Sequence, residues 1–319
     1  MTGFLEAHAA EVRAAAARIK PYVRRTPVLS TDLDPALRLK PECFQVTGSF
    51  KPRGAFNAVL SLMDSGRPSG VIAVSSGNHA QAVALAARSV GVPALILIPE
   101  DANPAKVAAT RALGAEVMQD GITFANREER LREIMAERGY KLVHPFDDWN
   151  VIHGAGTAAA ELLDDEPDLE VVVTPVGGGG LLSGTAISAH AHSASIKVIG
   201  VEPEQADDAY RTFRSGSIQS LGASPTTIAD GVRTTAIGAR NFEVMVENHL
   251  VDDIVTVSEQ EIADATRVAW TRLHLAIEPT GSLPLAAYLT GKLPRGRIGL
   301  VLSGGNANFQ TVARLLNTA

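Results

Sequence analysis

The chain of 319 residues has little cysteine, few aromatic residues (5%) and no long uncharged apolar stretch. Its single cysteine, Cys43, cannot form an intrachain disulfide, which is typical of the reducing cytoplasm, where we expect the protein to reside. No run of about 18 apolar residues is free of charge and glycine, so we expect no membrane-spanning helix and no membrane partner. Glu6 and Glu11 lie in an alanine-rich N-terminal pattern that lacks the cationic and apolar regions of a signal peptide.

Positive charge is also scarce, with 29 Lys and Arg against 35 Asp and Glu and a net charge of −6. Because no basic stripe is interleaved with aromatic residues, we expect no nucleic acid partner. A content of 45% hydrophobic and 20% charged residues is that of an ordinary globular protein. The length predicts either two lobes or one large α/β domain, and the sequence contains no internal repeat.

Strand patterns alternate with helix patterns along most of the chain. We predict strands at residues 71–75, 94–98, 115–119, 141–144, 171–176, 196–201, 254–257 and 298–302. We predict helices at 4–20, 55–63, from 79 to about 89, 103–114, 123–138, from 181, from 258 to about 274, and after 306. Asn103 followed by Pro104 is a helix start, and Ser258 with Glu261 forms a capping box. The alternation predicts right-handed βαβ units and a mostly parallel sheet.

One segment, TGSFKPRG at residues 47–54, places Lys51 where an extended run turns into a helix. Ser49 can cap this helix, and Pro52 falls in its first turn. The positive end of the helix dipole and a dry site would both favour a neutral lysine amine, which can condense with an aldehyde. The alternative is a surface lysine that merely begins a helix.

Three further strand-to-helix turns are rich in glycine and small polar residues. The four glycines at 177–180 let backbone amides approach an anion at a helix N-terminus, which is typical of a phosphate cradle or of a merely tight turn. The turn at 75–79 (SSGNH) offers amides for a carboxylate and an asparagine for a ring hydroxyl, and Ser303 in SGGN offers a neutral hydroxyl at a strand end. For both turns the alternative is a plain helix start. In open α/β sheets such turns gather beyond the carboxyl ends of the strands.

A lysine, a phosphate cradle and two polar turns together fit a ligand with an aldehyde, a phosphate and a heteroaromatic ring, as in pyridoxal phosphate (PLP). The chain resembles the fold-type II PLP enzymes, within them the family of serine/threonine dehydratases, serine racemases and hydroxyaspartate dehydratases. The motifs that carry the resemblance are TGSFK at 47–51, SSGNHAQ at 75–81, VGGGGL at 176–181, EP at 202–203 through ADD at 206–208, IADGV at 228–232, EPTG at 278–281 and SGGN at 303–306. It implies an α/β, tryptophan synthase β-like fold with mostly parallel sheets flanked by helices. It also implies two domains, a large PLP-binding one of residues 1–52 with 148–319 and a small mobile one of residues 53–147.

The resemblance also implies roles for the cofactor-binding residues. Lys51 would bind PLP covalently and then act as the base at the substrate Cα, and Phe50 would pack beside the ring. Asn78 would hydrogen-bond the ring hydroxyl, and Ser303 would face the pyridine nitrogen. The phosphate would be held by the main-chain amides of Gly177, Gly178, Gly179, Gly180 and Leu181.

Substrate contacts follow from the same resemblance. Ser75, Ser76, Asn78 and His79 would meet the substrate, and Ser76 is also implied as a second catalytic base, on the opposite face of the cofactor from Lys51. Its alternative role is only to cap a helix and offer its amide. Thr234 and Arg127 match hydroxyl-bearing and carboxylate-binding positions, Arg127 being alternatively an exposed helix arginine paired with Glu128 or Glu129.

A divalent-cation site is implied at Glu202, Ala206 and Asp208, where two carboxylates and one main-chain carbonyl would bind Mg²⁺, Ca²⁺ or Mn²⁺. The alternative is an acidic helix start. The sequence departs from the family pattern at Val46, His153 and Ala155 and in a shortened segment at 31–41, which leaves the preferred substrate open.

The sequence therefore predicts a PLP-dependent ammonia-lyase, and a homodimer, that dehydrates L-threonine or L-serine to a 2-oxo acid and ammonia. Serine racemisation and dehydration of 3-hydroxyaspartate are the alternatives within the family. A remote alternative is a non-catalytic α/β protein that binds a phosphate or a nucleotide.

Overall fold

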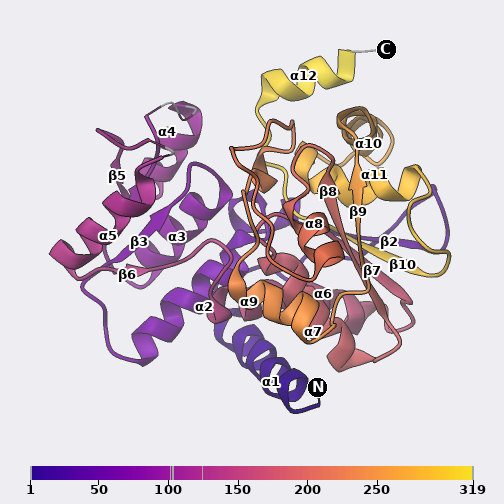
Figure 1. The fold of residues 1–319 in the computed structure, drawn as a ribbon, viewed down its shortest axis with the longest axis horizontal. Coiled ribbons are helices and arrows are strands. Elements are labelled where there is room, and N and C mark those ends of the chain that lie inside the picture. Colours follow the sequence, from indigo (N-terminus) through magenta and orange to yellow (C-terminus); the bar gives the residue numbers. More distant parts are fainter. Residues whose placement is uncertain (1, 101, 103, 124, 318–319) are drawn as a thin grey trace.

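The computed structural model describes residues 2–100, 102, 104–123 and 125–317. Within these residues the strands form two sheets, each the centre of one lobe (Figure 1). The larger sheet has the order β1-β2-β10-β7-β8-β9, and all its neighbours are parallel except β1 and β2. Its strands are β1 Leu29–Ser30, β2 Leu37–Pro41, β7 Val171–Pro175, β8 Lys197–Pro203, β9 Asp253–Val257 and β10 Ile298–Leu302.

The smaller sheet, at the left of Figure 1, is parallel throughout with the order β5-β4-β3-β6. Its strands are β3 Val71–Val74, β4 Ala94–Leu97, β5 Glu116–Met118 and β6 Lys141–Leu142. The central strands of both sheets are buried apolar runs, as expected when helices cover both faces of a parallel sheet. The predicted α/β class with mostly parallel sheets is confirmed.

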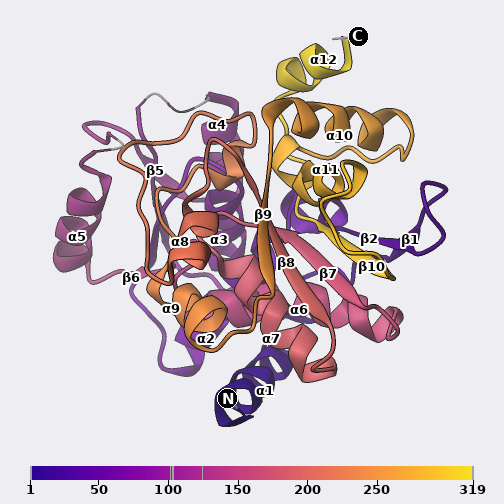
Figure 2. The ribbon, with the colours of Figure 1, turned by 45° about the vertical axis from the view of Figure 1, so that its right-hand side comes forward.

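Helices flank both sheets. They are α1 Thr2–Ile19, α2 Lys51–Asp64, α3 Asn78–Ser89, α4 Pro104–Ala112, α5 Arg127–Arg138, α6 Trp149–Asp165, α7 Gly180–His192, α8 Asp208–Ser215, α9 Ala239–Phe242, α10 Glu259–Thr271, α11 Leu283–Leu289 and α12 Phe309–Asn317. Short helical turns cover Glu42–Phe44, Val46–Gly48, Asp230–Val232, Glu243–Glu247 and Pro279–Ser282. Helices α6 and α7 lie on one face of the larger sheet and α10 and α11 on the other (Figure 2). No helix in the described part of the chain is long and apolar enough to cross a membrane.

Helix α6 packs closely against both α2 and α7. A Cβ atom added at Gly154 would lie 2.3 Å from the carbonyl oxygen of Arg53 on α2, and one added at Gly156 would lie 2.6 Å from that of Gly184 on α7. These glycines allow α6 to pack directly against two backbones at once. The helix that begins at Lys51 and the helix that follows the four glycines are thereby held in one rigid layer.

The polar core behind α2 is a buried ion network. The fully buried guanidinium of Arg53 binds Glu42 at 2.7 Å and Glu161 at 2.8 Å, and Lys40 binds Glu161 at 2.8 Å. Two cations and two anions compensate one another, which burial of such groups requires. Because Arg53 lies two residues after Lys51, this network anchors the start of α2 to the larger lobe.

Several local predictions are confirmed and others need correction. The capping box of Ser258 and Glu261 is present, but Asn103 lies outside the described residues. Helix α5 begins at Arg127 rather than 123, because Thr123 and Asn126 exchange hydrogen bonds in a preceding turn. The expected cap of α2 is wrong: Phe50 is the N-cap, and the buried Ser49 Oγ has no hydrogen-bond partner among the described residues. Ser49 instead forms an isolated bridge with Gly304.

Candidate active site

A cavity of about 600 Å³ lies between the lobes at the carboxyl ends of the strands. Fourteen residues that the sequence predicted to bind cofactor or substrate line it. They are Phe50, Lys51, Ser75, Ser76, Asn78, His79, Arg127, Gly177, Gly178, Gly179, Gly180, Leu181, Thr234 and Ser303. The predicted metal residues are outside its lining and form a separate cluster.

Lys51 begins α2, and its side chain reaches into the cavity. Its Nζ donates a hydrogen bond to the carbonyl oxygen of Pro145 at 2.9 Å and lies 5.0 Å from the centre of the Phe50 ring. Desolvation lowers the pKa of this amine to about 8, although the carboxyl group of Glu278 opposes the shift. The expected tendency toward a neutral amine is therefore present, and burial is its main cause.

The four glycines connect β7 to α7, where only glycine fits. A Cβ atom on Gly178 would lie 2.2 Å from the ring of Phe146, and Gly179 has a φ of +99°. The carbonyl oxygen of Gly178 accepts hydrogen bonds from Gly238 N at 3.1 Å and Asn241 Nδ2 at 2.9 Å. Because the peptide unit is trans, the Gly179 amide points away from the groups that hold this carbonyl. The turn has the form of an anion cradle at a helix N-terminus.

The turn at 75–79 precedes α3 on the opposite wall. Gly77 is the N-cap of α3 and no side chain caps the helix, so the alternative role of Ser76 as a helix cap is wrong. His79 Nε2 is 2.8 Å from the carbonyl oxygen of Val143, and burial lowers the pKa of this histidine to about 3. A neutral imidazole that donates from Nε2 leaves Nδ1 as an acceptor, and Nδ1 has no partner among the described residues.

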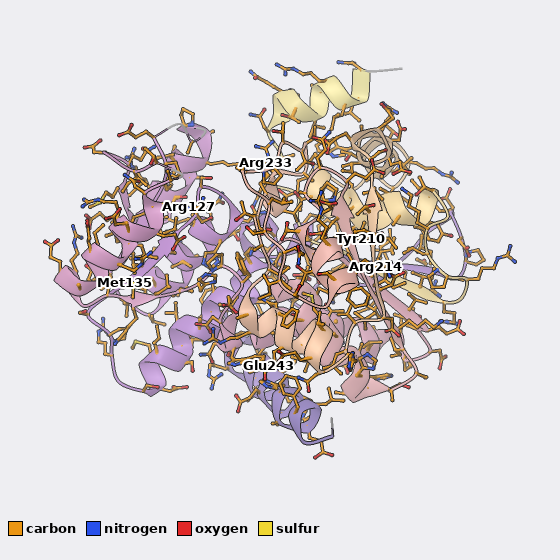
Figure 3. The ribbon with its side chains drawn as sticks, viewed as in Figure 1. Arg127, Met135, Tyr210, Arg214, Arg233 and Glu243 are labelled. Carbon is orange, nitrogen blue, oxygen red and sulfur yellow. The ribbon has the colours of Figure 1, made fainter. Side chains whose placement is uncertain are left out.

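Arg127 and Thr234 face the cavity from the two lobes. The Arg127 side chain is 29% exposed, and its Nε is 3.7 Å from Glu128 Oε1. Arg127 is therefore paired with Glu128, as in the alternative above, and it also lines the cavity. The hydroxyl of Thr234 is buried and has no hydrogen-bond partner among the described residues. Figure 3 places Arg127 in the smaller lobe and Arg233, a further residue of the cavity lining, on the other side of the junction.

Comparison with known proteins identifies the family. The model of the family described as pyridoxal-phosphate dependent enzyme matches residues 19–304. The chain belongs to this family. It is 44% identical to an L-threo-3-hydroxyaspartate ammonia-lyase of Saccharomyces cerevisiae, over 96% of this chain and 95% of that one. It is 40% identical to a serine racemase of Schizosaccharomyces pombe, over 96% of both chains. The crystal structure of a threonine deaminase from T.th. superposes with a TM-score of 0.89 and 49% identity, covering 94% of this chain and 98% of that one.

This membership confirms the predicted family, fold class and PLP cofactor. The chemistry of the cavity fits PLP. The Lys51 amine of lowered pKa, the glycine turn at 177–180 and the unpartnered Thr234 hydroxyl all line this one cavity. Ser303, at the end of β10, lies in the same lining, and its carbonyl oxygen accepts from Phe50 N at 3.0 Å. The PLP enzyme therefore has an amine of lowered pKa and a glycine-rich helix N-terminus in the lining of one cavity.

The sequence did not predict a site role for Glu278, which lines the cavity, or for Asn306 and Asn241, which contact lining residues. Glu278 is 3% exposed, and its Oε1 accepts from Asn78 Nδ2 at 2.9 Å. Burial first and Asp230 second raise the pKa of Glu278 to about 7. Asn306 and Asn241 hold Asn78 and Gly178 respectively. Glu278 and Asn306 belong to recognised motifs and could have been selected from them, whereas Asn241 lies in no motif.

The departures from the family pattern fall in different places. Ala155 lines the cavity, so the active site has only a methyl group at this position. His153 faces α1 instead, where its Nε2 lies 2.8 Å from Nδ1 of His8. Both rings stack near Trp149, at centroid distances of 4.0 Å for His8 and 5.7 Å for His153.

The predicted cation site forms a second polar cluster at the end of β8 and the start of α8. Glu202 and Asp208 are completely buried, and Ala206 is 1% exposed. Amides of Ala209 and Tyr210 donate to Glu202, but neither carboxyl oxygen of Asp208 has a hydrogen-bond partner among the described residues. Burial raises the pKa of Asp208 to about 7 and that of Glu202 well above its usual range, Asp208 adding to the shift of Glu202.

The donor set of this cluster fits a hard divalent cation. Two carboxylates without a counter-charge are costly in a protein interior, and oxygen ligands suit Mg²⁺, Ca²⁺ or Mn²⁺. The described residues contain no group of three or more His, Cys, Asp or Glu side chains placed to hold a metal. A cation here would therefore depend on the two carboxylates, the carbonyl of Ala206 and water.

Proposed function

We propose that this PLP enzyme dehydrates a β-hydroxy-α-amino acid, L-threonine or L-serine, to a 2-oxo acid and ammonia. The observation that carries the proposal is the lowered pKa of Lys51 inside a cavity that also holds an anion cradle. An amine that can lose its proton near neutral pH is suited to carry a proton from Cα.

The bound cofactor supplies an electron sink for the negative charge that develops at Cα. Lys51 would anchor PLP and, once released, would hold the Cα proton on Nζ. Phe50 would pack beside the ring, and Asn78 would donate to the ring hydroxyl. The amides of residues 177–181 would bind the phosphate. The hydroxyl of Ser303 would face the ring nitrogen, and because it is neutral it would favour prompt loss of the β-hydroxyl.

Substrate binding is assigned to the facing wall. Amides and hydroxyls of Ser75 and Ser76, with Asn78, bind the α-carboxylate at the start of α3. The unpartnered Thr234 hydroxyl supports a hydrogen bond to substrate, and neutral His79 shapes the wall beneath it.

The smaller lobe, residues 53–147, is proposed to move toward the larger one when substrate binds. An ion pair supports this assignment: Lys106 Nζ on α4 lies 2.5 Å from Asp230 Oδ2 of the larger lobe, and both line the cavity. Both side chains are partly exposed, so the pair can open at small energetic cost.

3-Hydroxyaspartate is the second candidate substrate, and Arg127 in the cavity lining favours it. The distal carboxylate of this compound would give the guanidinium a charged hydrogen-bond partner inside the cavity. The ammonia-lyase of S. cerevisiae described above is named for this compound. Serine racemisation is a third activity of the same site and depends on Ser76.

We further propose that Glu202, Asp208 and the Ala206 carbonyl bind Mg²⁺, and that the enzyme is a cytoplasmic homodimer. The paired, uncompensated carboxyl groups support the first assignment. The homodimer is tested by light scattering on the purified protein, for which a mass twice the 33.5 kDa of the chain is expected.

A substrate panel tests the proposal. We expect 2-oxo acid and ammonia in equal amounts from L-threonine and L-serine, measured beside D-serine and both 3-hydroxyaspartate diastereomers. Arg127→Gln should lower kcat/KM for hydroxyaspartate at least tenfold and leave that for threonine within about threefold, since a charged hydrogen bond contributes about 1.5–3 kcal/mol. A holoenzyme that forms no 2-oxo acid from any of them would refute the lyase assignment.

A further inference from the structure

Three side chains form a continuous hydrogen-bonded chain across the two lobes, and two of them, Asn78 and Glu278, line the cavity. Asn306 Nδ2 donates to Asn78 Oδ1 at 2.8 Å, and Asn78 Nδ2 donates to Glu278 Oε1 at 2.9 Å. Asn306 Nδ2 also donates to the carbonyl oxygen of Thr47 at 2.6 Å. The amide of Asn78 is therefore held at both its oxygen and its nitrogen.

The support for this chain comes from the backbone around Lys51. Gly305 N donates to the carbonyl oxygen of Gly48 at 2.9 Å, and Glu278 N donates to that of Gly304 at 3.0 Å. Gly48 has a φ of +73°, and a Cβ atom there would lie 2.6 Å from Asn306 Oδ1. Only glycine at this position leaves room for the Asn306 amide, so the loop after β10 is built to present it.

We propose that Asn306 and Glu278 are positioning residues that fix the rotamer and amide orientation of Asn78 toward the PLP ring hydroxyl. This inference rests on the proposed contact between Asn78 and that hydroxyl. Neither residue was given a role by the sequence motifs.

The orientation follows from the donor and acceptor inventory of one amide. Asn306 donates to Asn78 Oδ1, which turns this oxygen toward Asn306 and leaves the NH₂ group toward Glu278 and the cavity. One of its two hydrogens goes to Glu278, and the second is free to donate to an oxygen in the cavity. A flipped amide would place Asn78 Oδ1 against the acceptor Glu278 Oε1, and Asn78 Nδ2 against the donor Asn306 Nδ2. The flip would therefore lose both hydrogen bonds and leave buried polar atoms without partners.

Glu278 also makes the arrangement sensitive to protonation. Burial is the main cause that raises the pKa of Glu278 to about 7. Among the charged groups that act on it, Asp230 also raises this pKa, whereas Lys106 and Lys51 lower it. When Glu278 is ionised it accepts more strongly from Asn78 Nδ2 and polarises that amide toward the ring hydroxyl. The absorption of the bound cofactor should therefore report the ionisation of Glu278.

The test uses the holoenzyme without substrate. The absorption maximum of bound PLP is recorded from pH 5 to pH 9, and the dissociation constant of PLP is measured by quenching of protein fluorescence. The variants are Asn78→Ala, Glu278→Gln, Glu278→Ala, Asn306→Asp and Asn306→Ala, with Asn248→Ala as the control. Asn248 donates to Glu243 and lies outside the cavity lining.

Glu278→Gln keeps an acceptor for Asn78, so we expect wild-type PLP affinity within about twofold but no spectral titration near pH 7. Asn306→Asp replaces the donor to Asn78 by an acceptor, and Glu278→Ala removes the acceptor for Asn78. Both variants should shift the absorption maximum and weaken PLP binding about fivefold or more, the equivalent of one hydrogen bond. Asn248→Ala should behave as wild type. If Asn306→Asp fails to fold, Asn306→Ala provides the same comparison without the added charge.

The opposite outcome is equally specific. If Asn78→Ala changes the spectrum while the Glu278 and Asn306 variants all retain the wild-type maximum, titration and affinity, the positioning role is refuted and the proposed function stands. If Asn78→Ala also leaves the spectrum unchanged, the contact between Asn78 and the ring hydroxyl is refuted, and the positioning role with it.

Discussion

The Nζ atom of Lys51 donates a hydrogen bond to the carbonyl oxygen of Pro145 at 2.9 Å, which ties the reactive amine of one lobe to a turn that follows the smaller sheet. Desolvation lowers the pKa of this amine to about 8, and the carboxyl group of Glu278 opposes the shift. The balance between the two effects decides how readily the amine reacts with an aldehyde.

We predict that the apoenzyme captures PLP with an apparent pKa near 8. At pH 7 about a tenth of such an amine is neutral, roughly 300 times the neutral fraction of an ordinary lysine. The measurement is the second-order rate of appearance of the visible absorption band between pH 6 and pH 10. A rate that continues to rise steeply above about pH 9.5, where an ordinary lysine still titrates, would contradict the lowered pKa.

We predict that substitution of Ser76 separates dehydration from racemisation. Elimination from an L-amino acid requires one base, whereas racemisation requires a proton-transferring group on each face of the cofactor. Ser76→Ala should keep L-serine dehydration within about tenfold and lose both racemisation and any action on D-serine. Solvent deuterium at Cα and product chirality are measured in both proteins. Interconversion of enantiomers by Ser76→Ala at the wild-type rate would exclude Ser76 as the second base.

Removal of divalent cations should destabilise the wild-type enzyme. Without a cation, Glu202 and Asp208 bury carboxyl groups that repel each other, and Mg²⁺ would add binding free energy to the folded state alone. Asp208→Asn is the matched variant, because it removes one charge and keeps the side-chain volume. We expect Mg²⁺ to raise the Tm of the chelated wild type and to leave that of Asp208→Asn unchanged. Identical wild-type Tm values with and without Mg²⁺ would exclude the site.

The pair formed by His8 and His153 predicts acid sensitivity. Burial lowers the pKa of His153 to about 4 and lowers that of His8, on which Glu243 and Glu11 act in the opposite direction. A histidine with a depressed folded-state pKa contributes stability above its unfolded pKa of about 6.5 and loses that contribution as the pH falls toward 4. His153 alone should cost about 1.5 kcal/mol of unfolding free energy between pH 6.5 and pH 5.

Urea unfolding of wild type and His153→Ala at these two pH values measures the effect. The variant should show a smaller loss of stability on acidification, although its stability at neutral pH is lower because it leaves a cavity beside Trp149. Equal losses in the two proteins would show that His153 is not responsible.

The sequence predicted the parts of the site that depend on local chain signals. A β-branched strand, a glycine turn and a following helix must place the turn at the carboxyl edge of a parallel sheet, and this is where 177–180 and 75–79 are found. The location of Lys51 at a helix start follows from Pro52 in the same way.

Other features depend on contacts between distant segments and have no local signal. Asn241 reaches the cradle from a segment 63 residues away in sequence, and Asn306 reaches Asn78 over 228 residues. Serine is a residue type that often caps helices, but the bridge with Gly304 holds Ser49 in an extended conformation, so Phe50 is the N-cap. A pattern of residue types indicates which groups can act, whereas the packing determines which of them meet.

The most direct test of the account is the identity of the lysine that carries the cofactor. Borohydride reduction of the holoenzyme, followed by proteolysis and mass spectrometry, should place the reduced PLP adduct on Lys51, and Lys51→Ala should lack the visible band and the lyase activity together. A reduced adduct on any other lysine, or a Lys51→Ala protein that keeps the band, would contradict the assignment of the active site.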